Sequence, residues 1–202
     1  AKINTNEQLK RRWAFQAIRL AFYNGDTKTI QNTYNQYFKS NNCNDILSYW
    51  AMHFMTQSVK DTTYRSYLSA RVFANAPDKQ IILYQFSSDI NTNEILKYAQ
   101  NDLEKAQIYE ISAFKTFQKT LPQLKEIYKY HPTSKALSFL ILREVNKLED
   151  LILSPYYNFL GPAVTTNYSD YQDNNLYQQR IIEDKAYAKE LIMFLSSMKN
   201  TE

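Results

Sequence analysis

The sequence predicts an all-α protein, and three observations lead to this fold class. The chain of 202 residues contains only two glycines, Gly25 and Gly161. Apolar side chains recur three and four residues apart along most of its length, which is the spacing of one helix face. Residues 133–154 form the longest such segment. Tight hairpins, dinucleotide-binding turns and phosphate-binding loops all need glycine, so the composition argues against Rossmann, P-loop and β-sandwich folds.

The segment 133–154, TSKALSFLILREVNKLEDLILS, is expected to form one helix of about six turns at ~3.6 residues per turn. Its first half, 136–142, is apolar on nearly every side, so neighbouring elements must cover it from more than one direction. Its second half is amphipathic. The apolar stripe of this helix consists of Leu137, Ile141, Val145, Leu148 and Ile152. We therefore expect other helices to pack on it.

The first helix is expected to begin after Asn6, a good N-cap residue, and to end at Gly25, which suits the position after a helix. Asp26 can cap the next helix. The apolar face that we expect consists of Leu9, Trp13, Ala17, Leu20 and Ala21, broadened by Phe15, Ile18 and Phe22. The basic residues Lys10, Arg11, Arg12 and Arg19 lie mainly on the other side of this helix.

The other helices follow from the same spacing and from the prolines. Pro77 marks a boundary, because proline disfavours helical geometry in the residue before it, and Pro122 suits the first turn of a helix. We expect helices at residues 27–39, 45–60, 61–74, 79–88, 92–98, 102–117, 121–131 and 176–198. The segment 155–175 contains two prolines, one glycine and many turn-forming residues, so we expect a long irregular connection there.

A pair of antiparallel helices recurs along the chain. The three pairs span residues 13–38, 49–77 and 103–132, and the last two end on Pro77 and Pro132. This arrangement resembles the tetratricopeptide class of helical repeats over roughly the first two thirds of the chain. Gly25 and Tyr34 fall where that family has its turn glycine and second-helix aromatic residue, whereas Lys60 replaces the turn glycine of the second pair.

The resemblance implies a single helical-repeat domain over residues 1–202, with helix pairs stacked as a right-handed superhelix or solenoid. It implies a non-catalytic scaffold that binds a protein or peptide along a groove. The stretch Arg-Glu-x-Asn-Lys-x-Glu-Asp that begins at Arg143 also looks like uncharacterised helical-repeat proteins from Bacteroidota. This second likeness implies a bacterial source and no particular activity.

Composition limits the partners and the compartment. The net charge of +4 is mild and does not by itself favour nucleic acid, and no apolar run approaches the ~18 residues of a membrane span. We therefore expect a soluble protein without a nucleic-acid partner. Cys43 is the single cysteine, so no intrachain disulfide can form. The chain begins at Ala1, and removal of a signal peptide would place it in the periplasm or the cell envelope.

No residue pattern predicts an enzyme, a cofactor or a metal site. The histidines, His53 and His131, have no ligand-type residue at metal-binding spacing. The charged group Arg143, Glu144, Lys147, Glu149 and Asp150 is interpreted as a structural polar cluster rather than as an active site, because helical charge runs are usually solvated or bridge neighbouring elements. In a sharper form of this hypothesis, Arg143 and Glu144 are partly buried and hold the 155–175 segment in place.

The aromatic residues of the irregular segment are the best candidates for ligand binding. These residues are Tyr156, Tyr157, Phe159, Tyr168 and Tyr171. Tyrosine has an apolar body and a polar tip, which suits glycans, flat ligands and protein interfaces. The alternative function is therefore a carbohydrate- or small-ligand-binding module built around this segment. The structural alternative is that the same rings fold back and cover the long helix.

Overall fold

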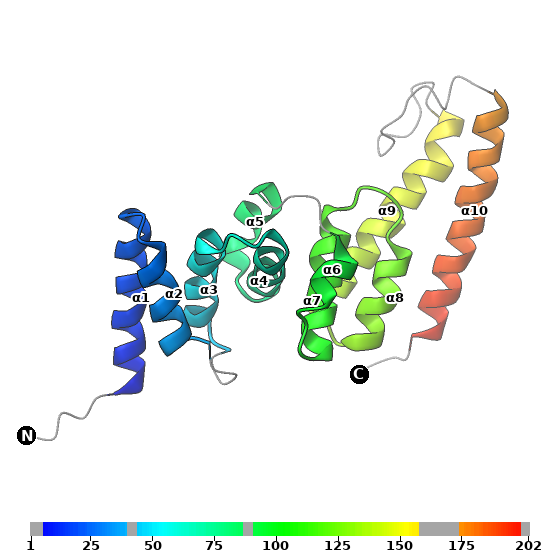
Figure 1. Cartoon of the computed structure of the whole chain (residues 1–202). Coiled ribbons are helices and arrows are strands. Elements are labelled where there is room, and N and C mark those ends of the chain that lie inside the picture. The colour runs from blue at the N-terminus through cyan, green and yellow to red at the C-terminus, as the bar shows by residue number, and fades with distance from the viewer. Residues whose placement is uncertain (1–5, 40–43, 87–90, 158–173, 199–202) are drawn as a thin grey trace, which may run out of the picture. The chain divides into compact units, whose positions relative to one another are not determined.

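The computed structural model describes residues 6–39, 44–86, 91–157 and 174–198. Within these ranges the chain forms ten α-helices and one short 3₁₀ helix, and it forms no strand (Figure 1). The prediction of an all-α protein is confirmed. Cys43, Phe159, Tyr168 and Tyr171 lie outside the described residues.

The helices lie close to the positions predicted. Their bounds are α1 Glu7–Tyr23, α2 Thr27–Tyr37, α3 Ile46–Ser58, α4 Thr62–Asn75, η1 Pro77–Lys79, α5 Gln80–Phe86, α6 Thr92–Leu96, α7 Asp102–Lys115, α8 Leu121–Tyr130, α9 Lys135–Tyr157 and α10 Asn174–Ser197. The largest difference from prediction is at α9, which continues through Pro155 to Tyr157. Pro155 has no N–H to donate to the carbonyl four residues earlier, so the last turn of α9 lacks that hydrogen bond.

The helices α1 to α4 each begin after a residue whose side chain caps the helix. Asn6 accepts a hydrogen bond from the backbone N–H of Gln8, and Asp26 accepts one from Thr29. Asp45 and Asp61 cap α3 and α4 in the same way. Such a side chain satisfies a backbone N–H that has no partner within the helix. Gly25, with a φ of 70°, makes the left-handed turn that lets α2 fold back beside α1.

The chain divides into two compact units, residues 1–112 and residues 113–202. In the first unit, α1 packs on α2, α3 packs on α4, and α2 also packs on α3 (Figure 1). Its core is made of aliphatic, aromatic and small side chains from each of these helices. Its most deeply buried members include Ile18, Ile30, Ala51, Leu68, Ala70 and Val72.

In the second unit, α9 packs against both α8 and α10. Leu121, Leu124 and Ile127 of α8 are buried, as are Leu137 and Leu140 of α9. The long helix is thus covered from two directions, as predicted. Its first half is not covered on every side, because Phe139 and Leu142 are exposed. Phe139 stacks on Phe114 with 5.3 Å between the ring centroids, which shields one face of its ring.

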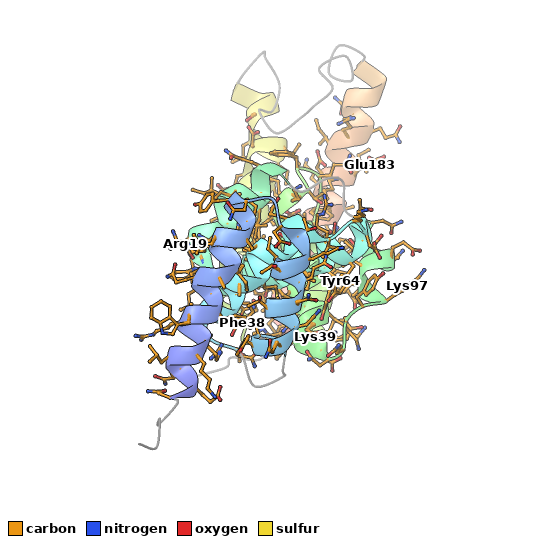
Figure 2. All side chains as sticks on the ribbon, turned by 60° about the vertical axis from the view of Figure 1, so that its left-hand side comes forward. Arg19, Phe38, Lys39, Tyr64, Lys97 and Glu183 are labelled. Carbon is orange, nitrogen blue, oxygen red and sulfur yellow. The ribbon has the colours of Figure 1, made fainter. Side chains whose placement is uncertain are left out.

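The prediction for the apolar face of α1 is confirmed for Phe15, Ile18 and Ala21 and was wrong for Leu9, Trp13 and Leu20. The residues of α1 that are buried are Ala14, Phe15, Ile18 and Ala21. Leu9, Trp13 and Leu20 lie on the opposite face and are exposed, and Arg19 lies on the side of α1 away from α2 (Figure 2). Both faces of this helix are apolar, so periodicity alone could not decide between them. The small side chains of Ala14 and Ala21 allow the neighbouring helices to approach closely, which favours the face observed.

Candidate functional site

A polar cavity of about 290 Å³ opens in the first unit. Its walls come from α3, α4, the turn before α7, and the first two turns of α7. The residues that line it are Asn44, Tyr49, Arg71, Gln100, Asn101, Leu103, Glu104 and Gln107. All but Leu103 carry polar side-chain atoms, and a small cavity with convergent polar groups is the usual form of a ligand site. We call it the unit 1 pocket.

The start of α7 fixes the position of the central carboxylate of this pocket. Asn101 accepts a hydrogen bond from the Glu104 backbone N–H at 3.0 Å and so caps the helix. In return, Glu104 Oε2 accepts from the Gln100 backbone N–H at 2.8 Å. This reciprocal arrangement is a form of capping box. It holds Gln100 and Asn101 at the rim and turns Glu104 and Gln107, one helical turn apart, toward the same cavity.

Arg71 and Glu104 form an ion pair at the base of the unit 1 pocket. Arg71 Nε lies 3.4 Å from Glu104 Oε1, and Glu104 is only 5% exposed. The Tyr67 hydroxyl donates a hydrogen bond of 2.8 Å to Glu104 Oε2. Burial and this bond raise the pKa of Tyr67 well above its usual value, so the phenol remains a donor. The two formal charges of the pocket therefore compensate each other.

Several polar groups of the unit 1 pocket have unused hydrogen-bonding capacity. Gln107 is 4% exposed, and its side-chain amide makes no hydrogen bond to another described residue but remains accessible from the cavity. Arg71 Nε is buried without a well-aligned acceptor in the same part of the chain. Burial raises the pKa of Tyr49, and the nearby charge of Arg71 opposes that rise. Buried polar groups are normally satisfied, so these groups mark a place where a ligand can supply the missing bonds.

The predicted polar cluster of α9 lies in the second unit, where Glu144 is 1% exposed. Glu144 Oε1 accepts from the Thr120 backbone N–H at 2.9 Å and from the Tyr187 hydroxyl at 2.5 Å. Glu144 Oε2 accepts from Thr120 Oγ1 at 2.5 Å and pairs with Lys147 Nζ. Burial alone would raise the pKa of Glu144, but the bonds from Lys147, Thr120 and Tyr187 lower it. Both carboxylate oxygens are thus fully engaged.

Arg143 anchors the connection between α7 and α8. Its guanidinium donates to the backbone carbonyls of Ala113, Phe114 and Thr116 at 2.6, 2.8 and 2.7 Å. Lys147 Nζ donates to the Gln118 carbonyl at 2.7 Å. The contacts described for this cluster run to residues 113–120 and to Tyr187 of α10. The hypothesis that the cluster holds the 155–175 segment in place concerns residues that lie mostly outside the described ranges, and it stays a prediction. Protein groups already occupy the hydrogen-bonding positions of Arg143, Glu144 and Lys147. The cluster therefore has the geometry of a structural network.

The other predicted site residues are less informative. Tyr156 and Tyr157 belong to the last turn of α9, but their side chains lie outside the described residues, as do Phe159, Tyr168 and Tyr171. Ligand binding by this segment therefore stays a prediction. His53 is partly buried, which lowers its pKa, and His131 is the C-cap residue of α8. No group of three or more possible metal ligands occurs among the described residues.

The outer face of α1 carries a row of exposed apolar side chains. Leu9, Trp13, Leu20 and Tyr23 are 52%, 68%, 65% and 73% exposed. They are spaced four, seven and three residues apart, so they share one side of the helix. Arg12 and Arg19, both exposed, follow one edge of this row. We call these four apolar residues the α1 stripe.

A second apolar surface lies between α9 and α10. It is a shallow groove of about 280 Å³ whose lining includes Val145, Leu148, Ile152, Leu191 and Leu195. Glu149 is its only charged lining residue among those described. The groove therefore has little charge pattern that would specify a partner.

Comparison of the chain with models of protein families, with curated proteins and with solved structures gives no match. In the part of the chain that the structure describes, no helix is both long enough and apolar enough to cross a membrane. The function is therefore inferred from the residues of this chain alone.

Sequence reasoning did not find the unit 1 pocket. Tyr49, Arg71 and Gln107 come from three helices that are far apart in the sequence, and no short motif joins them. Two signals were present. Asn101 followed by Glu104 has the spacing of a capping box, and Arg71 is a charged residue at a position where the spacing of α4 predicts a buried side chain.

Proposed function

We propose that this protein is a non-catalytic helical-repeat scaffold that binds a partner protein through the α1 stripe. The helix pairs α1–α2 and α3–α4 pack most closely within themselves and then on each other through α2 and α3, which supports a tetratricopeptide-like stack. Gly25 at the first turn and the buried Tyr34 of α2 agree with the same pattern. In such a stack each pair exposes a face on which a further helix can pack.

The exposed α1 stripe is the observation that carries the proposal. A helix at the edge of an array needs apolar residues only on its inner face, which here consists of Ala14, Phe15, Ile18 and Ala21. The outer face nevertheless presents a tryptophan, a tyrosine and two leucines in one row. Exposed apolar rows of this kind mark interaction sites, and tryptophan and tyrosine are enriched among the residues that dominate binding.

The spacing of the α1 stripe and the arginines along its edge indicate the kind of partner segment that it would bind. Apolar residues four, seven and three positions apart match the seam of a second helix packed along α1. Arg12 and Arg19 lie along one edge and would face acidic side chains of that helix. The expected partner segment is an amphipathic helix with an apolar stripe and glutamate or aspartate on its flank.

Fluorescence of Trp13 tests this proposal directly. In a Trp50→Phe background, Trp13 reports alone on the stripe. We expect a blue shift when a helical peptide with leucine at heptad a and d positions and glutamate on its flanks is added. The shift should weaken as salt increases, because exposed charges are screened over about 10 Å at 0.1 M salt. A peptide with lysine in place of glutamate should bind at least several-fold more weakly.

Matched variants distinguish specific binding at the α1 stripe from non-specific hydrophobic binding. Leu20→Asp should abolish the shift, whereas Ile81→Asp, a change at an equally exposed apolar residue of α5, should leave it intact. Three outcomes would contradict the proposal. The first is a Trp13 blue shift with anionic phospholipid vesicles but not with the peptide. The second is a dimer in sedimentation that the Leu20→Asp change abolishes. The third is no blue shift with either the acidic or the basic peptide.

A further inference from the structure

We propose that the unit 1 pocket binds a single uncharged sugar residue. This site shares no residue with the α1 stripe, and it differs from the Tyr-rich 155–175 segment for which sequence alone predicted ligand binding. The ligand class follows from three properties of the pocket, which are its unsatisfied amide, its compensated charge and its mixture of donors and acceptors.

The Gln107 amide is the first of these properties. An amide offers two N–H donors and one carbonyl acceptor, and no side chain or backbone group among the described residues bonds to it. The amide atoms are not among the fully buried atoms without a partner, so they remain accessible from the cavity that Gln107 lines. A glutamine that lines a cavity in this state is suited to a ligand that both donates and accepts hydrogen bonds. A sugar hydroxyl does both.

The Arg71–Glu104 ion pair excludes a strongly charged ligand. Glu104 is buried, and its Oε1 faces Arg71 Nε at 3.4 Å. A carboxylate or phosphate bound to Arg71 would lie close to this like charge, and an ammonium bound to Glu104 would lie close to the arginine. An uncharged ligand avoids both repulsions. It can use the guanidinium as a donor and the carboxylate as an acceptor at the same time.

Neighbouring donors and acceptors in the pocket match adjacent hydroxyl groups. Glu104 Oε1 accepts no well-formed hydrogen bond from the described residues, and the Gln107 amide lies one turn further along α7. The Tyr49 hydroxyl adds a third polar group from α3. Leu103, which is exposed at the rim, provides an apolar contact for the C–H face of a sugar ring.

The size of the cavity limits the ligand to one ring. Ligand pockets are usually about 300–1,000 Å³, and this one, at about 290 Å³, is at the lower end. The exposed side chains of Gln100 and Asn101 stand at its rim, where a substituent on the sugar would emerge.

Saturation-transfer-difference NMR and titration calorimetry with defined sugars test the inference. The probes are methyl glucoside, methyl galactoside, methyl mannoside and N-acetylglucosamine, with glucuronate and glucosamine as charged comparisons. We expect at least one neutral sugar to bind and the charged analogue of the same ring to bind at least tenfold more weakly. Gln107→Leu should abolish binding without lowering Tm, because it removes an amide that has no protein partner.

Gln85→Leu, an identical change at an exposed residue of α5 that does not line the pocket, is the matched control and should leave binding unchanged. If Gln107→Leu fails to fold, Tyr49→Phe removes a single hydroxyl and should weaken binding several-fold. The inference is overturned if no neutral sugar binds, if a charged analogue binds more tightly, or if both variants bind as well as the wild type.

Discussion

Glu104 and Glu144 are both buried glutamates, and they differ in how their oxygens are satisfied. Glu144 receives four polar contacts from Thr120, Tyr187 and Lys147, so every part of its carboxylate is held by protein groups. Glu104 receives two hydrogen bonds on Oε2, whereas Oε1 has only the longer contact to Arg71. Complete satisfaction is expected of a structural network, and incomplete satisfaction beside a cavity is expected of a binding site.

Replacing Glu144 with glutamine should strongly destabilise the protein. The change removes the negative charge and leaves the Lys147 ammonium buried without its counter-ion. Loss of one partner from a buried ion pair typically lowers the free energy of unfolding by about 3–5 kcal/mol. Chemical denaturation at pH 7 would measure it. Glu149→Gln, at an exposed position five residues further along α9, is the control and should change stability by less than about 0.5 kcal/mol.

The pH dependence of this variant has a definite sign. The folded protein lowers the pKa of Glu144 below its ordinary value of 4.5, so the ionised carboxylate stabilises the fold at neutral pH. That contribution is lost as the pH falls below about 4.5 and through the folded pKa. The difference in stability between wild type and Glu144→Gln should therefore narrow on acidification. A difference that stays constant down to pH 3 would show that the charge contributes little.

At the scale of the helix, local signals predicted more than periodicity did. The sequence predicted helix starts at Asn6, Asp26 and Asp61, and the structure has caps at these residues. Such starts can be predicted because a cap depends only on residues two or three positions away. Leu9, Trp13 and Leu20 were wrongly assigned to the buried face of α1 because both sides of that helix are apolar, and only the neighbours α2 and α3 decide which side is buried. The sequence predicted a structural cluster at Arg143, Glu144 and Lys147, but it did not predict the pocket or the Thr120 and Tyr187 partners of Glu144, since these join residues from separate helices.

Asp45 links a helix cap to a contact between helices, and its two roles can be separated. Its carboxylate caps α3 through the Ser48 N–H and pairs with Arg11 of α1 at 2.6 Å. The bond to Arg11, opposed by partial burial, lowers the pKa of Asp45 to about 2. Asp45→Asn should retain the cap and lose the ion pair, which is worth at most about 1 kcal/mol because the side chain is half exposed. Asp45→Ala should lower the free energy of unfolding by about 1 kcal/mol more, because it also removes the cap of α3.

Urea denaturation across a pH series distinguishes these effects. Because the pKa of Asp45 is lower in the folded protein than its ordinary 3.8, its ionised form stabilises the fold above pH 3.8, and this stabilisation disappears as the pH falls toward 2. The difference in free energy of unfolding between wild type and Asp45→Asn should therefore disappear between about pH 3.8 and pH 2. The gap between Asp45→Asn and Asp45→Ala should remain, since an amide caps a helix at any pH. Closure of both gaps would mean that the cap itself requires the charge.

At the scale of the whole molecule, each of the two compact units contains its own polar feature. The unit 1 pocket is built from residues 44–107, and the Glu144 network is built from residues 113–187. The network joins the connection before α8 to α9 and α10, and all of these elements belong to the second unit. We therefore expect a mutation that destabilises one unit to leave the stability of the other unit unchanged.

Hydrogen exchange of Glu144→Gln under native conditions should show a loss of protection confined to the second unit. Amides of α8, α9 and α10 should exchange roughly a hundredfold faster if the network contributes about 3 kcal/mol, because every ~1.4 kcal/mol is a factor of ten. Amides of α1–α4 should keep their protection, since the described contacts of Glu144 do not reach them. Local opening in separate cooperative units produces this pattern. An equal loss of protection in α1–α4 would instead show that the whole chain unfolds as one cooperative unit.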